Sequence, residues 1–347
     1  MFNPNFKYTN KIVNSLLKIM SARDTILNSY IIPKWEISLR RDALIRAAHA
    51  STAIEGNKLT LEEVSKLADG RKITAERKDK QEVLNYLKVL EDIDKYHEKG
   101  RITEKHILKL HKDISREVLE NPENEGFYRK MPVYVGNKIT GDIVFMPPPA
   151  ENVPALMKEL TGWLNSEESV EFNPVLVAGI AHYEFVRIHP FVDGNGRTAR
   201  ALATLILFTR GFDIKRFFAL DDYYDSDRRL YYEALKSVDP KSIETTQWLE
   251  YFIYGVFISM TRVKERVLKL SLEKHKKDTR GQIALTERQM QILESIIKNG
   301  RITSGEIQKM FNISRQAAHK ELKKMLSLEL IEPKGEGKAV YYIVCSG

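Results

Sequence analysis

The sequence predicts a mainly α-helical protein that contains one short β-hairpin and ends in a small separate module. Three observations support this prediction. Apolar residues recur with helical spacing over most of the chain as far as about residue 277. One pair of short β-prone segments, within residues 133–146, interrupts that pattern. After Gly281, three short helical segments are followed by two β-prone segments on either side of a glycine-rich turn.

Five helical segments are expected before the hairpin. Pro33 follows the first segment and Gly56 follows the second, and both residue types end helices because of their backbone geometry. Thr60 and Glu63 have the spacing of a capping box, in which each side chain accepts from a free amide of the first turn. The expected segments are 7–29, 38–55, 60–70, 77–98 and 104–120.

The hairpin is expected where Val133–Lys138 and Ile143–Met146 flank a turn rich in Gly, Asn and Asp. Pro147–Pro149 closes it, because proline cannot donate to a β-ladder. Helical periodicity then resumes. The charge run Glu273–Arg280 is interpreted as a solvated helix end and linker. The later helical segments are 151–167, 172–188, 195–210 and 241–277.

The C-terminal module has three capped helical segments and two strands, which is the winged-helix pattern. Thr286, Thr303 and Ser314 precede the three helices as N-cap residues. The β-prone segments 330–332 and 340–344 flank a turn that contains two glycines. The expected helices are 286–298, 303–311 and 314–326.

Composition and charge exclude several classes of protein. The chain has 347 residues, 43% of them hydrophobic, so it is long enough to bury a core without cross-links. Its single cysteine, Cys345, excludes an internal disulfide and a cysteine-ligated zinc site. No apolar stretch reaches the roughly 20 residues of a membrane span, and no signal peptide is recognised. We therefore expect a cytoplasmic protein without a membrane partner, and its net charge of +8 favours an anionic partner.

The segment 188–200 has the residues of an anion-binding loop followed by a helix. Gly194 and Gly196 allow backbone amides to approach a ligand closely. The helix that follows directs its positive dipole end at the same place, where phosphate is the usual occupant. Arg197 and Arg200 lie three residues apart on its first turn and can bind further phosphate oxygens.

Two other side chains complete this candidate site. Asp193 offers a hard oxygen ligand beside the phosphates, which suits Mg²⁺. His189 precedes Asp193 by four residues, and a neutral imidazole suits a general base at neutral pH. The set predicts transfer of a group from a polyphosphate to a hydroxyl.

The segment His189–Arg200 resembles the HPFxxGNGRxxR signature of the Fic family at every position. The segments His182–Phe185 and Gly126–Arg129 also resemble that family, and the resemblance covers roughly residues 50–240. It implies a Fic-type helical core with a β-hairpin flap, here residues 133–146, that positions the target. It also implies a protein adenylyltransferase, which moves AMP from ATP to a Ser, Thr or Tyr hydroxyl of a target protein.

The resemblance implies a role for each residue of the motif. His189 would deprotonate the acceptor hydroxyl, and Asp193 would hold Mg²⁺ against the phosphates of ATP. The backbone amides of residues 194–196, with Asn195, would hold the α-phosphate. Arg197 would bind the β- and γ-phosphates, and Arg200 the γ-phosphate. Phe191 would be a core anchor.

Related chemistries depart from this sequence at the two glycines. Doc-like kinases have a lysine in place of the second glycine, and phosphocholine-transferring relatives have an alanine in place of the first. Gly194 and Gly196 are both present here, which favours AMP transfer, with another nucleotide donor left open. Four tyrosines are candidates for a place near the adenosine, with ordinary packing as the alternative for each. They are Tyr223, Tyr224, Tyr231 and Tyr232.

The segment Ser51–Gly56 resembles the (S/T)xxxE(G/N) inhibitory motif of Fic proteins, in the N-terminal position typical of class II. Ser51 and Glu55 lie four residues apart on one helix face. The resemblance implies that Glu55 pairs with Arg200 and takes the place of the γ-phosphate, because a carboxylate and a phosphate compete for one guanidinium. Removal of AMP by the same glutamate, as in some relatives, stays open.

The third helix of the winged-helix module has the pattern of a recognition helix. Its apolar residues Ala318, Leu322 and Met325 share one face. Polar residues near its start could contact base edges or phosphates. They are Arg315, Gln316, His319 and Lys320. Residues 281–347 carry a net charge of +3, which is modest for DNA binding, and docking to a protein is the alternative.

The expected organisation has four parts. They are an N-terminal helical region (1–100), a catalytic core (101–260), a helical linker (261–280) and the winged-helix domain (281–347). A second hypothesis is a DNA-binding regulator whose core only senses nucleotide, and a third is a toxin-like enzyme whose tail represses transcription. The retention of His189, Asp193 and Arg197 favours an enzyme. The sequence leaves open the target, self-modification and homodimer formation.

Overall fold

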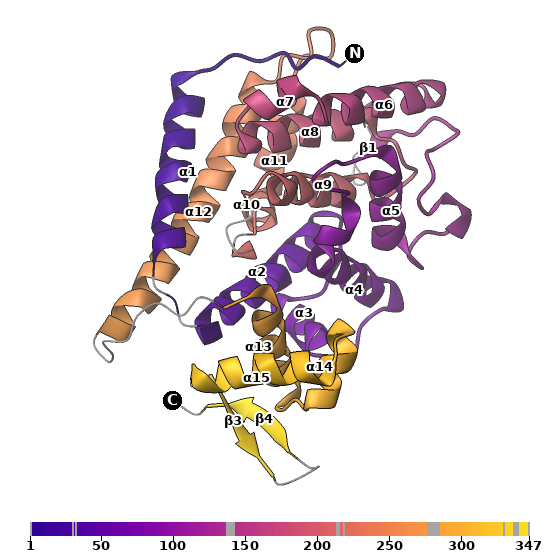
Figure 1. Ribbon diagram of the computed structural model, residues 1–347. Helices are drawn as coiled ribbons and strands as arrows, with labels where there is room; N and C mark the ends of the chain where they lie inside the picture. The colour runs from indigo at the N-terminus through magenta and orange to yellow at the C-terminus, as the bar shows by residue number, and fades with distance from the viewer. Residues whose placement is uncertain are drawn as a thin grey trace. The chain divides into compact units, whose positions relative to one another are not determined.

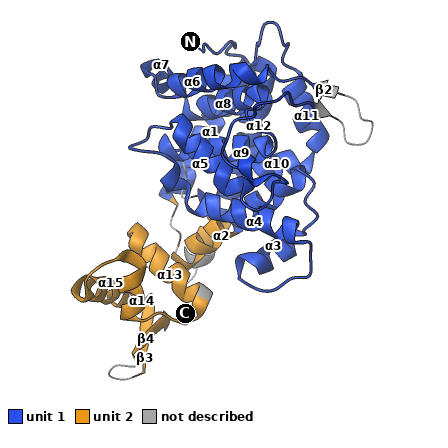
Figure 2. Ribbon diagram, turned by 90° about the vertical axis from the view of Figure 1, so that its right-hand side faces the viewer, with its two compact units in different colours: residues 1–28, 42–266 blue, residues 29–41, 267–347 orange. Residues whose placement is uncertain are grey.

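The computed structural model divides the chain into two compact units (Figure 2). The first unit combines residues 1–28 and 42–266, and the second combines residues 29–41 and 267–347. The structure describes residues 2–29, 31, 33–136, 143–212, 216–217, 219–275, 285–328, 330–335 and 340–345.

The first unit is helical, as the sequence predicts (Figure 1). Three short 3-10 helices, labelled η, join its longer helices. The helices of the chain up to the hairpin are α1 (Asn10–Asn28), α2 (Pro33–Ile54), α3 (Leu61–Ala68), α4 (Arg77–Glu91), η1 (Ile93–Tyr96), α5 (Glu104–Ser115) and η2 (Pro122–Asn124). Those after it are η3 (Ala150–Asn152), α6 (Val153–Leu164), α7 (Glu167–Glu171), α8 (Pro174–Ile188), α9 (Asn195–Thr209), α10 (Asp221–Ser226), α11 (Arg228–Lys236) and α12 (Thr246–His275).

The predicted helices agree with these elements except at several ends. The segment predicted over 77–98 is α4 followed by a separate 3-10 turn, because the Asp92 amide closes the last turn of α4 on the Lys88 carbonyl. The segment predicted over 104–120 ends at Ser115, and Glu117 just beyond it has a left-handed backbone with φ of 58°. The capping box of Thr60 and Glu63 is confirmed.

Three short helices, α7, α10 and α11, were not predicted. Each has fewer than ten residues, so an apolar period is hard to detect. The start of α11 nevertheless has a clear cap, because the Asp227 carboxylate accepts from the Leu230 amide at 2.9 Å.

Helix α8 is the centre of the first unit and is buried along nearly its whole length. It packs against α9, which runs beside it in Figure 1. Helix α12 approaches it at Gly179, where the Trp248 indole donates to the Gly179 carbonyl at 2.8 Å. A Cβ at Gly179 would meet side chains of α12, so glycine permits this close approach. This burial fixes both ends of the loop between α8 and α9.

Helix α1 lies along α12, and Figure 1 shows the two side by side. Thr9, just before α1, donates to the Glu250 carboxylate, and the Lys18 ammonium lies over the Phe257 ring at 5.3 Å. The N-terminal segment is therefore part of the first unit through contacts that are far apart in the sequence.

The predicted hairpin is confirmed in its strands. Strand β1 (Val135–Gly136) pairs antiparallel with β2 (Ile143–Phe145), with Val135 opposite Phe145. A register shift follows Val135, so the ladder is irregular. The predicted turn, 137–142, lies outside the described residues.

The second unit has the predicted winged-helix fold. Its helices are α13 (Glu287–Asn299), α14 (Ser304–Phe311) and α15 (Arg315–Ser327), and its strands are β3 (Ile331–Lys334) and β4 (Tyr341–Val344). Strands β3 and β4 pair antiparallel. Ile302, which lies between α13 and α14, forms a single isolated β-bridge with Tyr342 of β4. Thr286 and Thr303 form capping boxes and Ser314 caps α15, as predicted.

The first turns of α2 belong to the core of the second unit, which the sequence did not indicate. Ile37 is buried among the apolar residues of the module. Arg40 donates to the Glu287 carboxylate at 3.2 Å and lies 3.7 Å from Glu294. Of the predicted linker 261–280, residues 261–275 form the end of α12, and the remainder, with most of the charge run, lies outside the described residues. Among the helices that are described, none is long and apolar enough to span a membrane.

Candidate active site

The loop between α8 and α9 holds the predicted motif in a tight backbone turn. His189 ends α8 with a left-handed backbone, φ 50° and ψ 60°, which is uncommon for a residue with a side chain. Gly194 begins α9 with φ of 79°, a conformation that glycine adopts without cost. Because the Thr198 amide is the first of α9 to bond back to Gly194, the amides of residues 195–197 are the free donors of the helix start.

Arg129 holds the first half of this loop. Its guanidinium donates to the His189 carbonyl at 2.8 Å and to carbonyls of the segments before and after the hairpin. Its amide donates to the Pro190 carbonyl at 2.9 Å. The Gly126–Arg129 segment, noted in the sequence for its resemblance alone, therefore fixes the backbone of the catalytic histidine candidate.

His111, which no sequence pattern singled out, holds the second half of the loop. The Gly126 amide donates to its Nδ1 at 3.0 Å, so Nε2 carries the proton and donates to the Asp193 carbonyl at 2.9 Å. The ring stacks on Phe191 with centroids 3.6 Å apart. Burial lowers the pKa of His111 to about 4, so the ring stays neutral and keeps both bonds.

The Asn195 side chain is used entirely within the loop. Its Oδ1 accepts from the Phe191 amide and its Nδ2 donates to the Phe191 carbonyl, both at 2.9 Å. Asn195 is 3% exposed and Phe191 is fully buried. The Asn195 side chain therefore shapes the loop, and the Asn195 backbone amide remains a donor at the helix start.

Of the two residues expected to act on the substrates, Asp193 has an exposed side chain and His189 a partly buried one. Burial lowers the pKa of His189, so its imidazole is neutral at physiological pH. Its Nδ1 faces the Val186 carbonyl at 3.3 Å, which leaves Nε2 for a substrate. The Asp193 side chain is 55% exposed and accepts from the Gly194 amide at 2.6 Å. Within the described part of the chain, no three His, Cys, Asp or Glu residues gather as a metal cluster.

Arg200 is enclosed by α2, as the inhibitory-motif resemblance predicts. It donates to the Ser51 hydroxyl and the Ser51 carbonyl, each at 2.8 Å, and to the Glu55 carboxylate at 2.7 Å. Asp221, which the sequence did not single out, forms an ion pair with its Nε at 3.3 Å. Burial opposes the charge of Arg200, but the nearby acids outweigh it and raise its pKa well above the usual value.

The Glu55 carboxylate lies directly against the glycine-rich turn. A Cβ built on Gly196 would overlap Glu55 Oε1, so the carboxylate fills the space beside that glycine. The side chain of Glu55 is 29% exposed, whereas that of Arg200 is 1% exposed. An acid at the edge of the site thus neutralises a buried arginine and covers the second motif glycine.

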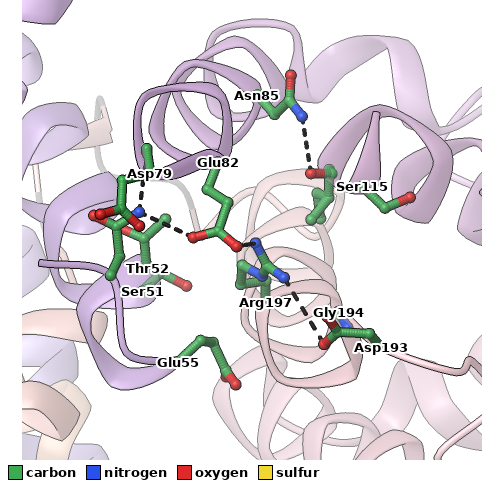
Figure 3. A network of polar contacts seen from close by, with 12 residues as sticks. Ser51, Thr52, Glu55, Asp79, Glu82, Asn85, Ser115, Asp193, Gly194 and Arg197 are labelled. Carbon is green, nitrogen blue, oxygen red and sulfur yellow. Dashed lines mark hydrogen bonds and ion pairs between the residues drawn. The ribbon is translucent and has the colours of Figure 1, made fainter. Parts of the chain in front are cut away.

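Arg197 has a different acidic partner, Glu82 of α4. Its Nη1 lies 3.0 Å from Glu82 Oε1, and its Nη2 lies 3.9 Å from the Asp193 carboxylate. Figure 3 shows the Glu82 carboxylate between the end of α2, where Glu55 lies, and Arg197. Arg197 is 2% exposed, and among the described residues its Nε and Nη1 have no hydrogen-bond partner, although Nη1 is at ion-pair distance from Glu82. Buried donors of this kind are suited to binding an anionic ligand.

Of the four tyrosines named as candidates near the adenosine, Tyr231 and Tyr232 differ in their surroundings. Tyr231 is 2% exposed, bonds to His182 at 3.0 Å, and packs with Tyr224 and Trp248 in an aromatic cluster. Tyr232 beside it is 41% exposed. Packing therefore accounts for Tyr231, and Tyr232 is the one of the pair that a ligand can reach.

In the second unit, α15 has the two faces that the sequence predicts. Its inward face consists of Ala318, Leu322 and Met325, all buried. Its outward face is polar and exposed over the first two turns. The exposed side chains include Arg315, Gln316, His319 and Lys320.

Two family models match parts of this chain. A model of the Fic/DOC family matches residues 101–207, and a model of the MarR family matches residues 285–338. The Fic/DOC match contains the whole motif loop. The MarR match contains α13, α14 and α15 but not the first turns of α2 that pack against them.

Curated relatives and solved structures agree with the first model. Protein adenylyltransferase Fic from Drosophila melanogaster is 35% identical over 180 residues, and that from Drosophila grimshawi is 34% identical. Each match covers 50% of this chain and about a third of the relative's own length. A Fic family protein from Desulfovibrio desulfuricans is 25% identical over all of this chain and 99% of its own, with a TM-score of 0.66. Fic-1 from C. elegans aligns over 74% of this chain and 73% of its own, with 24% identity and a TM-score of 0.60.

Proposed function

The chain carries a domain of the Fic/DOC family, and on that premise we propose that it is a protein adenylyltransferase that moves AMP from ATP to a hydroxyl of a target protein. One observation carries the proposal. The motif loop and the first turns of α9 bring together a neutral His189, the free amides of the helix start and two buried arginines. General base, phosphate cradle and charge partners are the components that this transfer needs.

In the proposed reaction, His189 removes the proton of the acceptor hydroxyl. The hydroxyl oxygen then forms a bond to the α-phosphorus, and the bond from that phosphorus to the bridging oxygen of the β-phosphate breaks. Pyrophosphate leaves, and the target carries AMP. The amides of residues 195–197 stabilise the charge on the α-phosphate, while Arg197 and Arg200 hold the phosphates that leave.

Mg²⁺ fits the exposed carboxylate of Asp193. One carboxylate and several phosphate oxygens are a common ligand set for this ion, which rarely needs a cage of protein ligands. Asp193 is open to solvent beside the helix start where the phosphates would bind. Bound there, the ion would neutralise phosphate charge.

We further propose that Glu55 inhibits the enzyme. Its carboxylate pairs with Arg200 at 2.7 Å and lies against Gly196, where the γ-phosphate would have to bind. Like charges repel, so the phosphate and the carboxylate cannot share the guanidinium. Ser51 supports this arrangement because its hydroxyl and carbonyl hold the same arginine.

The remaining residues of the site would contact the adenosine of ATP and the segment of the target protein. Tyr232 is the exposed candidate for contact with the adenosine, and Tyr231 supports it from the core. The hairpin that contains β1 and β2 would align the target segment, which could be another protein or the chain itself. A cytoplasmic location suits both the nucleotide and the single cysteine.

A second candidate function is sequence-specific regulation through the winged helix. It is favoured by the exposed Arg315, Gln316, His319 and Lys320 on α15 and by the match to the MarR family. In that case the first unit would only sense nucleotide. DNA binding would weaken steeply with salt, whereas docking to a protein would depend on salt much less.

The deciding experiment uses Mg²⁺ and ATP labelled on either the α- or the γ-phosphate, with host-cell lysate as the source of targets. The samples are wild type, Glu55→Gly and Glu55→Gly/His189→Ala. We expect covalent α-label on protein that is strongest in Glu55→Gly and absent in the double variant. Covalent γ-label would instead indicate a kinase, and the absence of label in all samples would favour the regulator.

A further inference from the structure

We propose that Glu82 is a positioning residue that links the first motif arginine, Arg197, to the end of the helix that carries Glu55. The inference deepens the proposed function, because it concerns how the same nucleotide site is held and inhibited. Glu82 is buried, at 7% exposure, on the inward face of α4, where Asn85 is the other buried polar side chain among mainly apolar ones. A carboxylate in such a place is costly unless both oxygens have partners.

The two oxygens of Glu82 serve two different parts of the site. Oε1 lies 3.0 Å from Arg197 Nη1. Oε2 accepts from the Asn57 side-chain amide at 2.9 Å. One rigid carboxylate therefore contacts the arginine proposed for the β-phosphate and a residue two positions after Glu55.

Asn57 in turn fixes the chain just after the inhibitory helix. Its backbone amide donates to the Thr52 carbonyl at 3.1 Å, and its side-chain Oδ1 accepts from the Leu59 backbone amide at 3.1 Å. These bonds set the turn at Gly56, whose φ of 102° is in the left-handed region. The direction in which Glu55 leaves the helix end depends on that turn, so the bond between Asn57 and Glu82 helps to hold Glu55 on Arg200.

The same carboxylate also orients the nucleotide site. Arg197 is almost fully buried, and among the described residues its ion-pair partners are Glu82 at 3.0 Å and the more distant Asp193 at 3.9 Å. Without this partner the guanidinium would lose its orientation toward the helix start. A ligand with a β-phosphate would then bind less tightly, whereas AMP, which lacks that phosphate, would be affected little.

The two roles can be separated by two substitutions. Glu82→Gln removes the charge that faces Arg197 but keeps an oxygen that can accept from Asn57. Asn57→Ala removes the side-chain bonds by which the turn after the inhibitory helix is held to Glu82, to the Asp79 carbonyl and to the Leu59 amide, and it leaves the ion pair between Glu82 and Arg197. Glu91→Gln is the matched control, because Glu91 lies on the same helix with an exposed side chain.

The experiment is isothermal titration calorimetry of the full chain with Mg²⁺ and ATP, ADP or AMP, with thermal melting as the check on folding. In the Glu55→Gly background, Glu82→Gln should weaken ADP binding by about tenfold or more, as expected for loss of a charged contact, with AMP changed by less than about twofold. With Glu55 present, Asn57→Ala should strengthen ATP binding toward the level of Glu55→Gly. In the Glu55→Gly background it should have no effect, and Glu91→Gln should match its parent throughout.

Equal weakening of ADP and AMP by Glu82→Gln would show that Glu82 supports only the fold. ATP binding by Asn57→Ala that equals wild type would show that Asn57 does not hold Glu55. If Glu82→Gln does not fold, the comparison of Asn57→Ala with and without Glu55 still decides the link to inhibition. Failure of every variant, including Glu55→Gly, to bind ATP would overturn the proposed nucleotide site itself, and this inference with it.

Discussion

The motif loop of the first unit and helix α15 of the second unit both carry cationic side chains, but they hold them in opposite ways. Arg197 and Arg200 are 2% exposed each, and each is held by its own buried or half-buried partners, Glu82 for Arg197 and Glu55 with Asp221 for Arg200. Arg315 and Lys320 on α15 are exposed. Buried charges in fixed positions are suited to stabilising one arrangement of phosphates, whereas exposed charges are suited to an extended anionic surface whose attraction is screened by salt.

The largest expected effect tests whether the loop performs chemistry. His189→Ala in the Glu55→Gly background should reduce the rate of AMP transfer by about 10² to 10⁴-fold, because the acceptor hydroxyl loses its base. The measurement is incorporation of α-labelled AMP. ATP binding should change little, since His189 contacts the acceptor rather than the phosphates. A parallel loss of ATP binding would mean that the substitution disturbs the loop instead.

The second effect tests whether Glu55 competes with the γ-phosphate for the buried Arg200. Glu55→Gly should increase AMP transfer by about 10-fold or more, which corresponds to removing one charged contact that competes with the γ-phosphate. ATP should also bind more tightly, and AMP, which has no γ-phosphate, should serve as the insensitive control ligand. Equal activity of Glu55→Gly and wild type on the same target would contradict inhibition by Glu55.

The third effect concerns the neutral histidines that support the loop. Because burial lowers the pKa of His111 to about 4, the unfolded chain binds a proton near pH 6.5 that the folded chain accepts only near pH 4. Stability should therefore fall as the pH drops through this window, by about 2 kcal/mol between pH 7 and pH 5 for this group. The pKa of His182, lowered to about 3 mainly by burial, acts in the same direction.

Urea unfolding at pH 7 and pH 5 measures this effect. His111→Phe keeps the stacking on Phe191 but cannot titrate, so it should be less stable at pH 7 and should lose less stability on acidification. A slope equal to that of wild type would mean that His111 is not the titrating group.

The smallest effect tests the exposed cationic side chains of α15. Lys320→Ala on α15 should weaken DNA binding by a few-fold at low salt and reduce the slope of log affinity against log salt concentration by about one. Fluorescence anisotropy with a labelled duplex at several salt concentrations measures both. AMP transfer should be unchanged. Binding that does not depend on salt would favour docking to a protein.

Much of the fold could be predicted because helix periods and caps are local. The capping boxes at Thr60, Thr286 and Thr303 are each set by residues three positions apart, and all three are confirmed. The short helices α10 and α11 were missed because they depend on burial of tyrosines against other helices. The place of Ile37 in the core of the second unit is also decided by packing, since nothing in its neighbours distinguishes it.

The candidate site divides in the same way. The residues of the loop lie within twelve positions of one another, so their proximity follows from the chain itself. Asn57 could have been suspected from the sequence, because it follows the inhibitory motif directly. Glu82 could also have been suspected, because it is an acid among mainly apolar residues on the buried face of a helix. His111 and Asp221 had no such signal. Their roles arise from hydrogen bonds to backbone groups and to an arginine that are remote in sequence.

The sequence by itself determined the helical architecture, the winged-helix pattern, and the identity and order of the groups on the motif loop. It did so because backbone propensities, caps and the reach of neighbouring side chains depend on residues close together in the chain. Only the tertiary structure decided that Glu82 faces Arg197, that Asp221 joins Glu55 at Arg200, and that the Asn195 side chain shapes the loop. Ser51, Glu55, Glu82 and Asp221 reach the two arginines from three separate helices. Their positions are fixed by the burial of those helices against α9, which no local pattern encodes.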